Sequence, residues 1–289
     1  MSFHGYTPSS RDRVNTRNFE TVGEFVRFAE CTTSTFSSPP SRESGRKHFF
    51  GTETFEDAIV LFGTGWREGA GKIASLKAGY DAFLAAAVDA KARSHGYDVT
   101  GHYIDVGRYL TGEPECFGVE VDEGSEISTK VAGIRLNSCV SGSVSADDII
   151  NRGLTVLLAV DLLESCGIRC EVIVSQATEY CNTIEESNVT VKRAKDAVDI
   201  DRLAFTIAHP SFFRRFGFAF CEARGHHPSA CNVSKMSDFR KREGFIEVEE
   251  VCTAHGFTKQ EIRSDVLKIA KACGLSFEDS QVEELLAHA

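Results

Sequence analysis

Residues 131–175 decide the fold and read VAGIRLNSCVSGSVSADDIINRGLTVLLAVDLLESCGIRCEVIVS. A short apolar run at 131–136 precedes a loop of small polar residues at 137–145. A strongly apolar stretch at 147–165 has the length and spacing of a helix, and a second strand-like run follows at 169–175. A strand, a helix and a strand at this spacing predict a right-handed parallel crossover.

The segments after this unit continue the alternation of strands and helices. A third strand-like run at 188–192 follows a short connection, so we expect it to pair antiparallel with the strand before it. The remaining patterns predict a helix at 199–208, a strand at 245–251, and helices at 259–273 and 277–287. The alternation predicts an α/β fold whose sheet is built by the second half of the chain and flanked by helices.

The first half of the chain predicts helices and exposed connections. Residues 1–52 predict a flexible arm with one short helix and a linker rich in Ser, Thr and Pro at 32–51. Within this arm, residues 1–18 are polar and lack periodicity. Residues 53–130 predict a mainly helical region, and residues 131–289 the α/β domain.

Composition excludes several classes of protein. The formal net charge is −10, which argues against a protein that wraps DNA over its whole surface. No apolar run approaches the roughly 18 residues of a membrane span, and the N-terminus shows no export signal. The ten cysteines are scattered, which favours reduced thiols. These features predict a cytoplasmic protein that does not bind membranes.

The catalytic motifs that the chain approaches are all incomplete. The glycine-rich stretch 63–72 resembles a phosphate-binding loop, but Trp66 stands where the first glycine is required. Ile73 stands where that motif needs a hydroxyl side chain to ligate magnesium. The Gly142-Ser143 stretch lacks the glycines of a nucleophile elbow. The sequence therefore predicts a protein that is not an enzyme.

Three residues have the spacing of metal ligands. Cys221, His226 and Cys231 are spaced Cys-x4-His-x4-Cys, as are the last three ligands of a zinc knuckle. The position of the first ligand is Phe218, which has no donor atom, and a structural zinc site needs four ligands. His227, Cys252 or His255 are the candidates to complete it. Bound zinc, and with it a zinc-dependent enzyme, stays an alternative to semi-buried cysteines and surface histidines.

The charge of the chain reverses locally between residues 214 and 242. This stretch has seven basic and two acidic residues, with phenylalanines interleaved. Arginine beside aromatic rings is typical of a groove for single-stranded nucleic acid. The alternative is that the rings form core and the arginines are solvated. The candidate nucleic-acid-binding residues are Arg214, Arg215, Arg224, Arg240, Lys241 and Arg242.

Residues 131–190 resemble a von Willebrand factor A domain, a Rossmann-like α/β fold, in the order of their predicted elements. In that family the loop after the first strand reads Asp-x-Ser-x-Ser and holds a magnesium ion. The matching loop here supplies Asn137, Ser141 and Ser143 but no leading aspartate. The resemblance thus implies a degenerate metal loop, because Mg²⁺ loses its main charged ligand. We predict no cofactor, with Mg²⁺ or Zn²⁺ as the alternatives.

Several passages resemble uncharacterised proteins of tailed bacteriophages. They are FGTGWREG at 62–69, YLTGEP at 109–114, NRG at 151–153, LLESCG at 162–167, DRLAF at 201–205, AHP at 208–210 and the Arg214-Arg215 pair. The resemblance implies a viral protein in the host cytoplasm. We therefore expect a non-enzymatic binding or adaptor protein whose partner is a phage or host protein. The alternative is an accessory protein that binds single-stranded DNA or RNA during phage transcription or replication.

Overall fold

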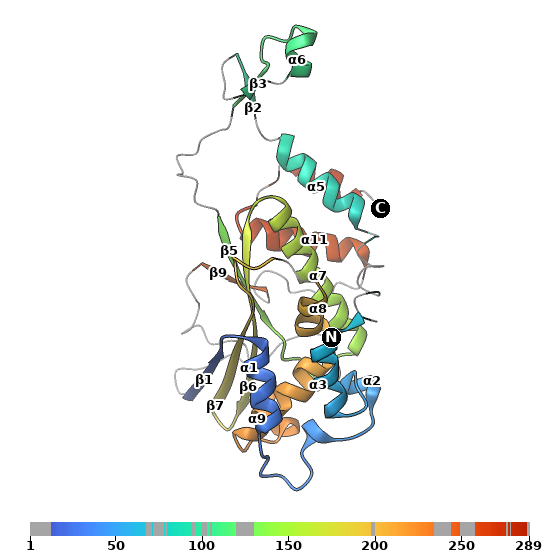
Figure 1. Cartoon of the computed structure of the whole chain (residues 1–289), viewed down its shortest axis with the longest axis vertical. Helices are drawn as coiled ribbons and strands as arrows, with labels where there is room; N and C mark the ends of the chain where they lie inside the picture. The colour runs from blue at the N-terminus through green and yellow to red at the C-terminus, as the bar shows by residue number, and fades with distance from the viewer. Residues whose placement is uncertain are drawn as a thin grey trace.

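The computed structural model has a mixed α/β fold built on one long sheet (Figure 1). It describes residues 13–67, 71, 78, 80–93, 96–99, 103–104, 106–119, 130–197, 200–233, 244–248, 258–275, 277 and 279–287. The strand order is β1 (Arg13–Phe19), β7 (Thr183–Lys192), β6 (Arg169–Tyr180), β5 (Val131–Asn137) and β9 (Phe245–Glu247), and β8 (Asn232–Val233) also pairs with β6. β6 is antiparallel to β7 and β8, and the other neighbours are parallel. The predicted α/β class is confirmed.

The parallel crossover at the centre of the sheet is also confirmed. β5 and β6 pair in parallel from Val131 opposite Arg169 to Asn137 opposite Ser175, and α7 (Ala146–Ser165) connects them. The helix begins where the Ser145 side chain accepts a hydrogen bond from the Asp148 backbone, and the Asp148 carboxylate accepts one in return. β6 then turns into the antiparallel β7, as expected.

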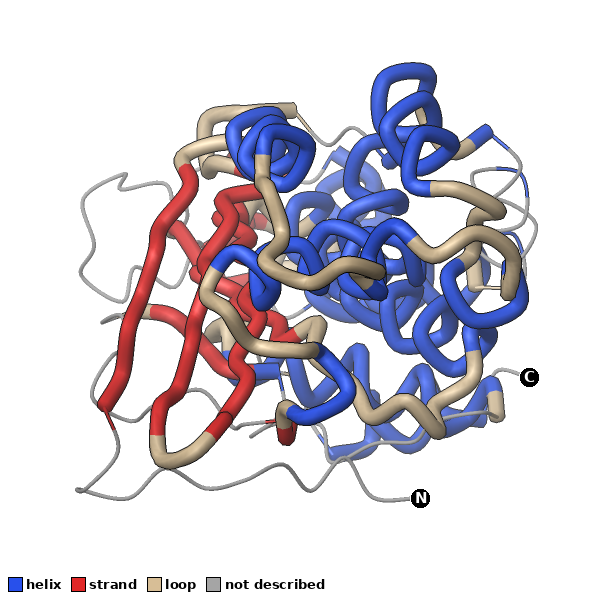
Figure 2. The backbone as a smooth tube through the Cα atoms, turned by 90° about the horizontal axis from the view of Figure 1, so that it is seen from below, coloured by secondary structure: helices blue, strands red, loops and turns tan. Residues whose placement is uncertain are grey.

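Helices cover one face of the sheet, as Figure 2 shows. α7 packs on β6, α8 (Ile200–Ala208) packs on α7 and β7, and α11 (Lys259–Ala272) packs on α7. Towards β7 and β1 lie α1 (Val22–Cys31), the π-helical turn η2 (Phe212–Gly217) and α9 (Phe218–Ala223). The helix predicted at 277–287 is α12 (Asp279–Ala287). No helix in the described parts of the chain is long and apolar enough to span a membrane.

The N-terminal segment differs from the predicted flexible arm. Residues 13–19 form the edge strand β1, and Phe19 packs its ring 5.0 Å from Phe25 and 6.4 Å from Phe220. The expected linker at 32–51 contains the short turns η1 (Pro40–Arg42) and α2 (Lys47–Phe50). It is held by distant partners, since buried Ser41 donates a 2.6 Å hydrogen bond to Glu222.

The region between α3 (Phe55–Thr64) and β5 contains helices and a second, small sheet. α3 and α5 (Asp81–Arg93) lie in the region 53–130 that the sequence predicts to be mainly helical, and many of the residues between them lie outside the described residues. β2 (Gly96–Asp98), β4 (Phe117–Val119) and β3 (Tyr103–Ile104) pair in that order, and α6 (Val106–Thr111) lies between β3 and β4 in the chain. Figure 1 places α6, β2 and β3 at one end of the molecule, beyond α5.

Residues from all three predicted regions share one hydrophobic core. The same cluster of buried side chains contains Phe19 and Phe25 from the predicted arm and Phe83 from the predicted helical region. It also contains Ile134 of β5 and Leu285 of α12. The described parts of 13–93 therefore pack on the α/β unit instead of forming a separate core.

Candidate functional site

A cleft of about 880 Å³ lies beyond the carboxyl end of β5. The loop after β5 forms one wall, and η2 with α9 forms another. In open α/β sheets, ligands bind outside the carboxyl ends of the strands. We call this the carboxyl-edge cleft; its lining includes Glu43, Arg46, Phe49, Phe50, Cys139, Ser141, Thr178, Phe213, Arg214, Phe218, Cys221, His227, Ser229 and Cys231.

Two arginines stack on one phenylalanine in this cleft. The guanidinium carbon of Arg214 lies 4.1 Å from the centre of the Phe49 ring, and that of Arg46 lies 4.8 Å from it. Arg214 is 1% exposed and donates hydrogen bonds to the backbone oxygens of Phe49, at 2.8 Å, and Val144, at 2.6 Å. Arg214 thus holds the segment around α2 against the loop that follows β5.

The next arginine, Arg215, is a buried structural group. Its guanidinium lies 3.9 Å from the centre of the Phe50 ring and donates to four backbone oxygens of the 41–53 segment. These acceptors belong to Ser41, Glu43, Thr52 and Glu53. The Glu53 oxygen also accepts a 3.0 Å backbone hydrogen bond from Gly45, and the guanidinium adds partners for the oxygens of this irregular segment, which lacks a regular backbone ladder.

The structure therefore does not place Arg214 and Arg215 in a basic surface groove. Phe212 and Phe216 bury this stretch in the core, which carries both guanidinium groups inside with it. Arg224 lies at the surface, 3.5 Å from Glu185 and stacked on Phe220. The other three candidates, Arg240, Lys241 and Arg242, lie outside the described residues.

Two of the predicted zinc ligands line the cleft, and the third turns away from it. Cys221 and Cys231 line the cleft, whereas His226 points towards β7, with Nε2 3.7 Å from a Glu185 carboxylate oxygen. The cause is Gly225, whose positive φ of 77° redirects the chain after α9. Among the described residues, no three His, Cys, Asp or Glu side chains lie close enough to hold a metal ion. The predicted set therefore does not fit a zinc site; Cys252 and His255 lie outside the described residues.

Three thiols face the cleft from different segments of the chain. Burial raises the pKa of Cys139. The hydrogen bond between Cys221 and Cys231, together with burial, raises the pKa of Cys221, and the same bond lowers the pKa of Cys231. Cys231 is thus the thiol of this pair whose surroundings favour the thiolate. The nearby His227 ring bonds through Nδ1 to the Ser229 hydroxyl, at 2.7 Å.

The loop predicted as a degenerate metal site is folded on itself. The Asn137 side-chain oxygen accepts a 3.0 Å hydrogen bond from the Cys139 backbone. The Ser141 and Ser143 hydroxyls are 3.1 Å apart and exposed. Residues 137–145 contain no carboxylate, so this loop provides only neutral oxygens. It does not fit the charged ligand set that Mg²⁺ prefers.

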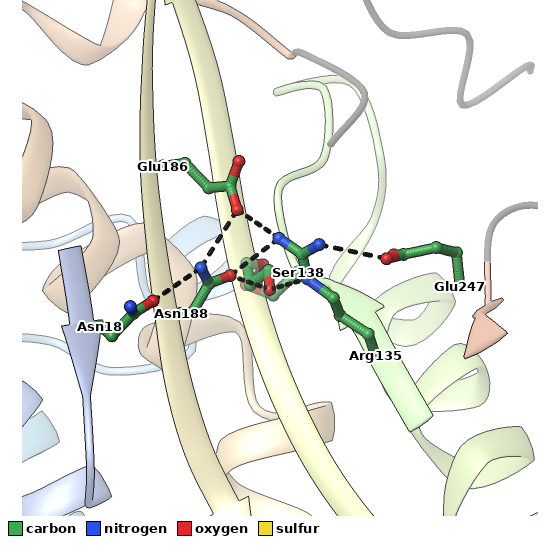
Figure 3. A network of polar contacts seen from close by, with 7 residues as sticks. Asn18, Arg135, Ser138, Glu186, Asn188 and Glu247 are labelled. Carbon is green, nitrogen blue, oxygen red and sulfur yellow. Dashed lines mark hydrogen bonds and ion pairs between the residues drawn. The ribbon is translucent and has the colours of Figure 1, made fainter. Parts of the chain in front are cut away.

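On the other face of the sheet, Arg135 forms a buried network that the sequence analysis missed (Figure 3). Its guanidinium donates to the Glu186 carboxylate, to Asn188 at 2.9 Å, to Ser175 at 2.8 Å and to Glu247 at 3.1 Å. Asn188 in turn bonds Asn18 of β1. The network ties five strands together, and two carboxylates pair with the buried guanidinium. The sequence feature that could have indicated this network is a basic residue, Arg135, inside the apolar run 131–136.

The second candidate surface is a cluster of exposed apolar side chains around α6. None of the six residues of α6 is buried, and Leu110 and Tyr109 are 78% and 62% exposed. We call the described residues between 96 and 119 the α6 module. Its exposed large apolar side chains are Val99, Ile104, Val106, Tyr109 and Leu110. Several exposed large apolar side chains within one small module are typical of surfaces that bind other molecules.

Comparison with known proteins assigns the chain to a family. No curated protein and no solved structure matches it. The model of a domain of unknown function, DUF7192, matches residues 7–274, which cover both the carboxyl-edge cleft and the α6 module. Since this match spans most of the chain, the protein belongs to the DUF7192 family.

Proposed function

We propose that this protein is a non-enzymatic adaptor that docks onto a protein partner through the α6 module. The observation that carries the proposal is the exposure of apolar side chains on α6. Val106, Tyr109 and Leu110 have the three- and four-residue spacing that places side chains on one face of a helix. A short apolar helix face of this kind fits an apolar groove on a partner, with tyrosine as an anchor.

The net charge of the α6 module indicates which charge the partner should carry around that groove. The stretch 96–119 contains four acidic residues and a single basic residue, Arg108, which pairs with Glu113 at 3.2 Å. Glu115 is exposed. A partner groove with an apolar floor and a basic rim complements this surface.

The proposal includes the origin and fold that the resemblances imply. The adaptor acts on a phage or host protein in the cytoplasm of an infected bacterium. Its central sheet is a von Willebrand A-like sheet without a metal centre. The order β7-β6-β5-β9 supports this part of the proposal. The parallel crossover joins β5 to β6, and the next strand in the chain, β7, pairs antiparallel with β6.

The test compares partner recovery by two charge variants. Leu110→Glu places a charge in the proposed contact, and Val60→Glu places one at another exposed apolar residue, in α3 outside that contact. We expect affinity purification from infected cells to recover the same partner with the wild type and Val60→Glu. Recovery with Leu110→Glu should fall at least about tenfold, because a buried leucine contributes roughly 1.5–3 kcal/mol.

Binding of the purified partner to the three proteins then measures the effect directly. Equal affinity of all three proteins would contradict the proposal. If instead the wild type self-associates in size-exclusion chromatography and Leu110→Glu is monomeric, the α6 module binds a second copy of the chain. Unchanged thermal unfolding of both variants checks that neither substitution disturbs the fold.

A further inference from the structure

The charge of Arg214 has no acidic partner in the described part of the chain. Its terminal nitrogens bond only the backbone oxygens of Phe49 and Val144, and its Nε has no hydrogen-bond partner. No ion pair of the described residues includes it, although it is 1% exposed. A buried charge without a counter-charge is energetically costly. The presence of Arg214 at this position therefore calls for an explanation beyond packing.

A second positive charge lies beside it in the carboxyl-edge cleft. Arg46 stacks on the same Phe49 ring, and its side chain is half exposed. Burial, reinforced by the charge of Arg46, lowers the pKa of Arg214 to about 10. The carboxylate of Glu43 also lines the cleft and lies 3.5 Å from Arg46.

The neighbouring Arg215 shows the contrast. It too is fully buried, but four carboxylates surround it and favour its charged form: Glu43, Glu53, Glu56 and Asp57. Burial lowers the pKa of Arg215, but carboxylates of the chain oppose that effect, and Arg215 does not line the cleft. Of the two adjacent buried arginines, only Arg214 combines an unbalanced charge with access to a cavity.

The phenylalanine rings that line the cleft indicate what kind of chemical group a ligand would carry besides its anionic group. Phe49, Phe50, Phe213 and Phe218 line it, so an apolar or aromatic body would find ring surfaces there. The volume of about 880 Å³ lies in the range of pockets for small organic molecules.

We propose that the carboxyl-edge cleft binds a small organic anion, a phosphate or carboxylate on an aromatic body. Arg46 and Arg214 hold the anionic group, since guanidinium forms strong charge-assisted hydrogen bonds with oxyanions. The phenylalanine rings hold the aromatic body. The site is independent of the adaptor function, because no residue of the α6 module lines this cleft.

The experiment measures binding of defined probes to the full chain by ligand-observed NMR at low salt. Phenyl phosphate and benzoate carry the proposed chemistry, and benzyl alcohol is the uncharged control. We expect both anions to bind at least tenfold more tightly than benzyl alcohol. The stronger of the two identifies the anionic group. Inorganic phosphate should bind more weakly than phenyl phosphate, because it lacks the ring.

Three variants assign the binding to the cleft. Arg46→Gln removes a half-exposed charge, so we expect the fold to persist, and it should weaken phenyl phosphate binding at least about tenfold. Glu43→Gln removes the competing carboxylate and should tighten binding by about twofold to fivefold. Arg224→Gln, at another ring-stacked arginine outside the cleft, is the matched control and should bind as the wild type does.

Two results would overturn the inference. One is that neither anion binds more tightly than benzyl alcohol. The other is that Arg46→Gln and Arg224→Gln have the same effect, which would place the binding elsewhere on the surface. Inorganic phosphate that binds as tightly as phenyl phosphate would overturn the aromatic part of the proposal.

Discussion

His209 shows how its surroundings decide the role of a single residue. It is buried between aromatic rings, with Trp66 at 4.6 Å and Phe205 at 5.3 Å between ring centres. Its Nδ1 accepts a 3.2 Å hydrogen bond from the Ser211 backbone. Burial lowers the pKa of His209 to about 3. The ring is therefore neutral in the folded protein and serves as a packing group with one hydrogen bond.

This environment predicts a pH dependence of stability. The folded pKa of His209 lies below the unfolded value of 6.5, so its protonation favours the unfolded state. The stability that the neutral ring contributes is complete above pH 6.5 and is lost as the pH falls towards 3. The free energy of unfolding should fall across this window by up to about 1.4 kcal/mol per pH unit from this group.

Urea denaturation at several pH values measures the effect. His209→Asn keeps an acceptor at the position of Nδ1 for the Ser211 backbone but cannot titrate. Its free energy of unfolding should depend less steeply on pH than that of the wild type between pH 6.5 and 4. Parallel pH dependences of the two proteins would show that His209 does not contribute.

At the scale of elements, the contact between α7 and α8 depends on one missing side chain. A Cβ atom on Gly153 of α7 would lie 2.4 Å from the Cβ and 2.6 Å from the Cα of Ala208 in α8. The two backbones thus approach as closely as glycine allows. α7 also packs on β6 and α8 on β7, so the spacing of the two helices affects how they cover the sheet.

Gly153→Ala should therefore destabilise the protein, although alanine favours helices. We expect the free energy of unfolding in urea to fall by about 1–3 kcal/mol, the typical cost of overpacking. Gly63→Ala in α3 is the matched control, because no atom lies within 4 Å of its added Cβ. That variant should gain up to about 1 kcal/mol. An equal gain for Gly153→Ala would contradict the close approach.

At the scale of the whole molecule, the N-terminal segments and the α/β unit share one core. Phe25 lies 5.4 Å from Phe212, and Phe55 lies 5.4 Å from Phe216. Trp66, the single tryptophan of the chain, packs against His209. These contacts join residues 13–66 to residues 205–220, so the two parts should unfold together.

Trp66 makes this prediction measurable. Its fluorescence reports the contact between the two parts, and far-ultraviolet circular dichroism reports the whole molecule. We expect both signals to follow the same urea transition. Phe19→Ala, a change in β1, should shift both equally, with a loss of about 3–5 kcal/mol. A tryptophan transition at lower urea than the circular dichroism transition would indicate two separate domains.

Local features of the sequence predicted much of the fold. The α/β class, the crossover through α7 and the antiparallel β7 follow from apolar periodicity and turn residues between neighbouring segments. Such signals lie within a few residues, so the sequence alone carries them. The strand β1 was missed because it forms only by pairing with β7, which lies more than 150 residues away in the chain.

The candidate sites depended on long-range packing. Phenylalanines around Arg214 and Arg215 indicated either a groove or a core, and only the folded chain shows that both guanidinium groups are inside. The same packing turns His226 away from the two cleft thiols. The amino-acid sequence thus specifies which elements form, because their hydrogen bonds and periodicity are local. Tertiary structure decides which side chains meet and which charges lack a partner, because these depend on segments brought together only by folding.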